Sequence, residues 1–197
     1  MIAARRSLPV LALAGALLAG PAPVCAAEDN ADIAVHVEKD GGTIRVRVDC
    51  PVRAPAAIAW DVLTDYDNMA KFVSNLTQSS VRMRMGDRVQ VFQKGKASRG
   101  PLSIAFENVR EIELVPRTEI RSRIVSGDTM PAEFVTRIEE RGGEVHVVHT
   151  GHYTPSMWVP PGIGPALIEA ETRKQYGEIR AEIVRRAGAK GGRAGGG

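Results

Sequence analysis

The chain has 197 residues, 44% of them hydrophobic and 25% charged, which suits one domain with a core that is stable without disulfides. Of its 26 basic residues only Arg5 and Arg6 precede position 28, so the rest of the chain has 24 basic and 23 acidic side chains. This balance, without a basic stripe carrying interleaved aromatics, argues against nucleic acid as a partner.

Residues 1–27 have the features of a cleaved secretory signal. Arg5 and Arg6 precede an apolar run over residues 8–18, and small residues up to Ala27 supply a cleavage site. The run is shorter than the roughly 20 apolar residues that span a bilayer, so we expect cleavage and not anchoring. We therefore expect a periplasmic or secreted protein.

The two cysteines give little chemistry. Val24 before Cys25 disfavours a lipoprotein, and the nearby arginine pair matches a twin-arginine signal only in part. After cleavage Cys50 has no intramolecular partner, and we expect a small buried apolar residue there.

The middle of the chain reads as strands interrupted once by helices. Alternating apolar residues between 31 and 48 predict a β-hairpin that turns at 40–42. Pro55 opens a helical stripe, and a second short stripe follows Asp67-Asn68. From there to about Tyr153, apolar residues recur with period two between turn signals, which predicts an antiparallel meander of long strands.

The C-terminal part predicts a long amphipathic helix over residues 163–187, with an apolar face that must pack against the sheet. The Gly-rich residues 188–197 are expected to be a disordered tail, and their basic residues favour a solvated end over transient membrane contact. The sequence thus predicts an α+β domain over residues 28–187. We expect a curved antiparallel sheet of about six to seven strands on a long C-terminal helix, with two short helices near the N-terminus.

Residues 56–73 resemble a known family. Trp60-Asp61-Val62-Leu63, Asp65-Tyr66 and Lys71-Phe72-Val73 are similar to the opening helices of polyketide cyclase/dehydrase and coenzyme Q-binding proteins of the START-like (SRPBCC) superfamily. The order of predicted elements is similar over nearly the whole domain, although Ser74 stands where relatives commonly carry proline. The resemblance implies a helix-grip fold and a lipid, quinone or polycyclic ligand.

Inward positions of the predicted strands and helices supply the candidate cavity lining. The aromatic residues of the short helices are better explained as packing residues than as ligand contacts. The inward strand residues could equally well belong to a filled core or to the lining of a cavity. The last strand reaches the long helix at a corner that suits either a cavity mouth or simple packing. The candidate ligand-binding residues are Trp60, Tyr66, Phe106, Ile120, Ile124, Phe134, His149, Tyr153, Met157, Trp158 and Leu167.

No nucleophile elbow, P-loop or paired cysteine motif is present, so no cofactor is expected. His146, His149 and His152 recur every three residues, which in a strand sends His149 to the opposite face from the other two and disfavours a metal site. His149 and Tyr153 are weak acid–base candidates, and a satisfied or outward-facing His149 is the alternative. Arg110 points inward unless a bulge near Asn108 turns it out.

These observations favour an exported, monomeric protein that binds or carries a hydrophobic small molecule. We favour a binding protein over an enzyme. Two alternatives stay open, a polyketide cyclase/aromatase-type enzyme and a protein-interaction module with a filled core.

Overall fold

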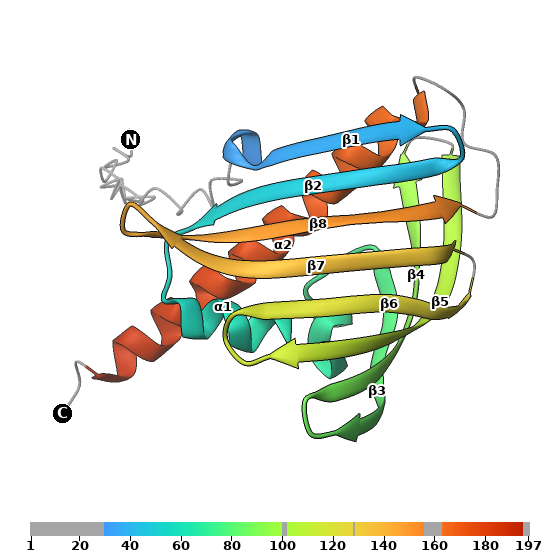
Figure 1. Cartoon of the computed structure of the whole chain (residues 1–197). Helices are drawn as coiled ribbons and strands as arrows, with labels where there is room; N and C mark the ends of the chain where they lie inside the picture. Colours follow the sequence, from blue (N-terminus) through green and yellow to red (C-terminus); the bar gives the residue numbers. More distant parts are fainter. Residues whose placement is uncertain (1–29, 100–101, 128, 156–162, 195–197) are drawn as a thin grey trace, which may run out of the picture.

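The computed structural model describes residues 30–99, 102–127, 129–155 and 163–194. In this part of the chain eight antiparallel strands form one sheet in the order β1-β2-β8-β7-β6-β5-β4-β3, and helix α2 crosses one of its faces (Figure 1). The strands are β1 (Ala34–Asp40), β2 (Thr43–Val52), β3 (Leu76–Met85), β4 (Arg88–Arg99), β5 (Leu102–Val115), β6 (Glu119–Gly127), β7 (Thr129–Arg141) and β8 (Glu144–Pro155). The helices are the 3₁₀ turn η1 (Asn30–Asp32), α1 (Ala56–Leu63), the 3₁₀ helix η2 (Tyr66–Lys71) and α2 (Ile163–Ala194).

The predicted α+β architecture is confirmed, with eight strands in place of six or seven. The difference arises at the N-terminus, because both strands of the predicted hairpin join the sheet and β1 becomes its edge. Gly86 and Gly142 each adopt a φ of 59° in the turns before β4 and β8, a conformation that glycine reaches without steric cost.

The two short helices occupy the predicted positions, α1 directly after Pro55 and η2 as a 3₁₀ helix. The chain then passes through Ser74, whose backbone N–H and hydroxyl donate to the Glu178 carboxylate on α2 at 2.8 and 2.5 Å. A proline at this position would remove the N–H donor. The departure from the family pattern therefore adds a contact that fixes the path after the second helix to α2.

Helix α2 buries a stripe of apolar side chains against the sheet. Tyr176, Ile179 and Ile183, spaced three and four residues apart, belong to the contiguous core, and α2 lies nearest to β1, β2 and α1. Cys50 on β2 is 1% exposed in the same core, as predicted. The stripe thus joins the helix to the half of the sheet that contains the N-terminal hairpin.

The helix continues to Ala194, beyond the predicted end at Ala187, so residues 188–194 are helical and not part of a disordered tail. Lys190 in this extension pairs with Asp61 of α1 at 3.1 Å. Arg185 and Arg186 both pair with Glu182. In the described ranges no helix is long and apolar enough to cross a membrane. The expected signal, residues 1–27, lies outside these ranges.

The first described residues are fixed on α2 by a buried arginine. Arg180, whose side chain is 9% exposed, donates to both carboxylate oxygens of Asp32 at 2.8 Å and to the Asn30 amide oxygen at 2.9 Å. Gly177 makes this approach possible, because a Cβ there would lie 2.2 Å from the Asn30 side chain. The hydrogen bond from Arg180 is the main cause that lowers the pKa of Asp32.

Asp32→Asn should lower the free energy of unfolding at pH 7 by about 1 kcal/mol, a small value because the aspartate is largely exposed and screened. A depressed carboxyl pKa adds stability above the unfolded pKa of about 4, so the difference from wild type should shrink as pH falls below that value. Urea denaturation between acidic and neutral pH measures both effects. Asp40→Asn, which breaks the exposed pair with Arg45, is the control and should change stability by less than about 0.5 kcal/mol. An equal loss of unfolding free energy in the two variants would contradict a specific contribution of the Arg180–Asp32 ion pair.

Candidate functional site

The inner face of the sheet, which α2 covers, gathers a group of aromatic and polar side chains. Phe134 and Thr136 on β7 and His149 and Tyr153 on β8 share the inward positions of two paired strands, and Tyr176 approaches from α2. We call these five residues the His149 cluster. The inward orientation of His149 agrees with the period-two pattern of β8, where Val145 and Val147 on the same face are buried.

His149 is held on three sides. Its Nδ1 lies 2.8 Å from the Thr136 hydroxyl, its ring is stacked on Phe134 with centroids 5.4 Å apart at 15°, and the Tyr176 ring lies 5.5 Å away at 44°. Burial, followed by the charge of Arg110, lowers the pKa of His149 to about 4. The imidazole is therefore neutral at pH 7.

A glycine makes room for the Phe134 ring. Gly151 lies directly opposite Phe134 in the β7–β8 ladder, and a Cβ at position 151 would lie 2.3 Å from Cδ1 of that ring. The ring consequently lies against the β8 backbone, with its centroid 6.3 Å from that of Tyr153. The absence of one side chain thus sets the aromatic surface of the cluster.

Arg110 on β5 extends the cluster with a cation. Its Nε donates to the Asn108 side-chain oxygen at 3.1 Å, and its Cζ lies 5.4 Å from the Phe134 ring centroid. The β5–β6 register shifts between Val109 and Arg110, which leaves Val125 of β6 unpaired, whereas β5 stays in register with β4. The bulge therefore lies on β6 and Arg110 points inward, where burial lowers its pKa.

Two hydroxyls of the interior have no hydrogen-bond partner in the structure. They belong to Tyr66 of η2, which is 5% exposed, and Ser122 of β6, which stands opposite Phe134 in the β6–β7 ladder. Burial raises the pKa of Tyr66, whereas the nearby charge of Arg110 lowers it. Because buried polar groups are normally paired, each of these hydroxyls lacks a hydrogen bond that a buried oxygen would usually make.

The predicted lining residues that do not belong to the His149 cluster fall into three groups. Tyr66 and Ile120 belong to the contiguous core, and Trp60 and Phe106 pack at its edge half-buried. Ile124 and Leu167 are buried but do not belong to that core. Met157 and Trp158 lie outside the described residues.

Interior side chains near this region keep some accessible surface. His149, Tyr153 and Arg110 face inward, and burial is the first cause of each pKa shift, yet all three are only half-buried by accessible area. Closely packed protein leaves no such area around interior groups. These side chains are therefore not covered completely by their neighbours on the inner face of the sheet.

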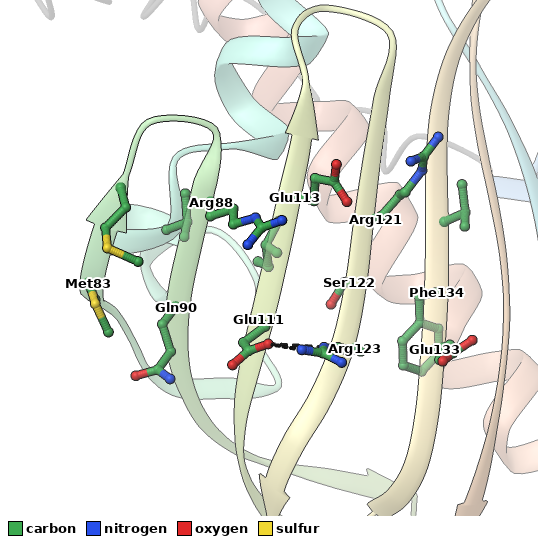
Figure 2. A pocket seen from close by; sticks show the side chains of 14 residues that line it. Met83, Arg88, Gln90, Glu111, Glu113, Arg121, Ser122, Arg123, Glu133 and Phe134 are labelled. Carbon is green, nitrogen blue, oxygen red and sulfur yellow. Dashed lines mark hydrogen bonds and ion pairs between the residues drawn. The ribbon is translucent and has the colours of Figure 1, made fainter.

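A separate groove of about 550 Å³ lies on the opposite face of the sheet, away from α2 (Figure 2). Its walls include side chains of both charge signs, and the exposed Met83 and Met85 of β3 stand at one side. Glu111 and Arg123, which Figure 2 joins by a dashed line, form an ion pair across β5 and β6. Ser122, one of the two residues with an unpartnered hydroxyl, and Phe134 of the His149 cluster also line this groove. We place the candidate site on the inner face because the His149 cluster gathers there.

The other two histidines of β8 point outward, as predicted. His146 Nδ1 lies 2.6 Å from the Asp49 carboxylate, and His152 is exposed. Among the residues for which the structure gives positions, no cluster of three His, Cys, Asp or Glu side chains is arranged to hold a metal ion. The three-histidine spacing therefore does not form a metal site.

Tyr176 and Thr136 were not among the predicted site residues. Tyr176 lies three residues before Ile179 on the buried stripe of α2, and Thr136 lies two residues after Phe134 on β7. Both positions follow from the helical and strand periods. Both residues could have been predicted by listing the polar side chains that fall on the apolar face of a predicted helix or strand.

Comparison with known proteins defines the class. A family model described as polyketide cyclase/dehydrase and lipid transport matches residues 43–184, and the chain belongs to this family. No curated protein sequence matches the chain significantly.

Solved structures share the fold at low sequence identity. A STAR-related lipid transfer protein from Xanthomonas axonopodis has a TM-score of 0.58 at 12% identity, covering 76% of this chain and 98% of that protein. The Zhui aromatase/cyclase from Streptomyces sp. R1128 gives 0.60 at 15%, covering 73% and 95%. A START superfamily protein from Mycobacterium smegmatis gives 0.60 at 12%, covering 72% and 97%. These likenesses establish the helix-grip fold.

Gly151→Ala should lower the free energy of unfolding by about 2 kcal/mol, because the added methyl overlaps Phe134 and a backbone oxygen of Glu133. Gly188→Ala on α2 meets nothing within 4 Å and should leave stability unchanged or slightly raised. Chemical denaturation of both variants measures the contrast. A Gly151→Ala protein as stable as wild type would contradict the close approach of Phe134.

His149→Gln should reduce the acid sensitivity of the fold. The unfolded imidazole titrates near pH 6.5 and the folded one near 4, so wild type loses up to about 1.4 kcal/mol per pH unit between these values. The variant should not show this pH-dependent loss of unfolding free energy when urea denaturation is measured from pH 7 to pH 4. His152→Gln, an exposed histidine of the same strand, should retain it. The interior placement of His149 is wrong if the two variants show the same pH dependence.

Proposed function

We propose that this chain is an exported, monomeric protein that binds or carries a hydrophobic small molecule such as a lipid, quinone or polycycle in the interior of its fold. The observation that carries the proposal is the His149 cluster, which is enclosed between sheet and helix yet keeps accessible surface. Family membership supports it, because this fold family binds hydrophobic small molecules.

The cluster suits a flat or chain-like apolar ligand. Phe134, His149 and Tyr153 present rings at 5.4 and 6.3 Å from one another, a spacing at which aromatic groups stack or tilt. Burying apolar ligand area contributes about 25 cal/mol per Å² before the cost of association. A few polar groups at the edge of this surface then orient the ligand.

Acid–base catalysis is less well supported than binding. An effective general acid or base has a pKa near the working pH, whereas His149 is shifted to about 4 and burial raises the pKa of Tyr153 to about 12. Both groups therefore serve better as hydrogen-bond partners for a bound ligand. A cyclase-type enzyme remains the alternative that turnover assays address.

The proposal also includes export of the protein and a C-terminal end that is solvated and does not bind a membrane. The signal-like residues 1–27 support secretion to the periplasm or beyond. Arg185, Arg186 and Lys190 are paired with carboxylates of the protein, which weakens the attraction of this end for an anionic membrane surface.

The first test is native mass spectrometry of the protein from its own host, followed by organic extraction of any released compound. We expect a bound lipid, quinone or polycycle, and a ligand-free mass would favour transient substrate binding or an interaction module with a filled core. Reaction of an added polyketide would instead identify a cyclase.

Ile124→Trp should reduce ligand retention by at least about tenfold, because a larger side chain fills the interior space beside the cluster. Val135→Trp is the matched control, since Val135 borders the outer groove and its replacement should leave retention unchanged. Circular dichroism verifies that both variants fold. Loss of ligand only in Val135→Trp would move the binding site to the outer groove.

A further inference from the structure

The turn between β3 and β4 presents an unbroken run of exposed side chains. Residues 82–88 read Arg-Met-Arg-Met-Gly-Asp-Arg, and every one of them is exposed. We call these residues the β3–β4 hairpin tip. Met85 pairs with Arg88 across a two-residue turn, and the Asp87 backbone oxygen accepts a hydrogen bond from the Leu114 N–H of β5 at 2.8 Å. The tip is therefore held in a fixed place at the edge of the sheet opposite to β1 (Figure 1).

Two methionines at this tip are exposed on one face of the hairpin. Met83 is 46% and Met85 64% exposed, and they are the two large hydrophobic side chains that are exposed in the described part of the chain. Both border the outer groove, where Figure 2 shows Met83 on β3. Methionine is unbranched and flexible, so it adapts to an irregular apolar surface. Exposed apolar side chains that lie together indicate a contact surface.

Three arginines surround these methionines and keep their charge uncompensated. None of the ion pairs between described residues includes Arg82, Arg84 or Arg88. Arg82 lies over the Phe92 ring, with its Cζ 4.3 Å from the ring centroid, a contact that leaves the cation charged. Asp87 is the one acidic residue of the tip, so three positive charges and one negative charge give it a net charge of +2.

The lack of ion pairs distinguishes the tip from the basic end of α2. Arg185 and Arg186 both pair with Glu182, and Lys190 pairs with Asp61. A paired cation attracts an external anion less strongly, because the carboxylate beside it cancels much of its field. The hairpin tip is therefore better suited than the end of α2 to contact an anionic surface.

We propose that the β3–β4 hairpin tip docks on an anionic lipid bilayer. Met83 and Met85 enter the interfacial layer of the membrane, and Arg84 and Arg88 contact lipid phosphates. Apolar insertion and electrostatic attraction are the two contributions that hold such surface elements on membranes. Nucleic acid would attract the arginines but offers no apolar layer for the methionines. The proposal goes beyond ligand binding and does not depend on what the interior of the fold holds.

Vesicle sedimentation of the protein purified from its own host tests this docking. We expect binding to mixed phosphatidylglycerol–phosphatidylcholine vesicles to be at least about tenfold tighter than binding to phosphatidylcholine alone. The preference should largely disappear when the salt concentration rises from about 0.1 M to about 0.5 M, because salt screens exposed charges.

Two double variants with the same loss of charge locate the contact. Arg84→Gln with Arg88→Gln should weaken binding to the anionic vesicles by about tenfold. Arg185→Gln with Lys190→Gln is the matched control, which removes two charges that are already paired and should bind as wild type does. An equal loss in the two variants would refute a specific role of the tip.

The methionines are tested by Met83→Ser with Met85→Ser. This variant should bind the anionic vesicles several-fold more weakly than wild type while keeping the salt dependence, because it loses apolar insertion and no charge. Circular dichroism verifies that each variant folds. The proposal is refuted if the serine variant binds as wild type does, or if wild type binds both kinds of vesicle equally. Binding of wild type to polyglutamate without binding to vesicles would also overturn it, and would assign the tip to an acidic protein surface.

Discussion

The packing of α2 on one half of the sheet is the constraint on which the interior depends. The buried stripe around Tyr176 and Ile183 joins the helix to β1, β2 and α1, and ion pairs at Arg180 and Lys190 add polar contacts along its length. A straight helix cannot follow a sheet that bends as strongly as β4 and β5 do in Figure 1. The helix therefore packs mainly on β1 and β2, and the His149 cluster lies beside this contact on β7 and β8.

The two faces of the sheet differ in the number and charge of their polar side chains. On the outer face, charges of opposite sign alternate between neighbouring strands, as Glu111 and Arg123 do, and keep a large exposed surface soluble. On the inner face, polar groups are few and neutral except for Arg110.

Much of this architecture followed from the residue pattern. Alternation located the strands and the inward face of His149, and the glycine turns separated them, because these signals depend on local sequence. The direction of Arg110 did not follow, since it depends on which of two paired strands carries the bulge at Val125. The end of α2 was misplaced because the Gly-rich composition of residues 188–194 predicted a tail, whereas the helix continues there and Lys190 pairs with Asp61 of α1. The unpartnered Tyr66 hydroxyl did not follow either, because the lack of a partner depends on the residues that pack around η2.

The clamp between Asp32 and Arg180 has a consequence for the order of folding. It joins residues near the two ends of the described chain, and β2 likewise pairs with β8. Contacts between such distant segments form only after the last helix has been synthesised, and a high average sequence separation slows folding. The chain thus remains unable to complete its core until its last helix is available, a property compatible with the export that we propose for it.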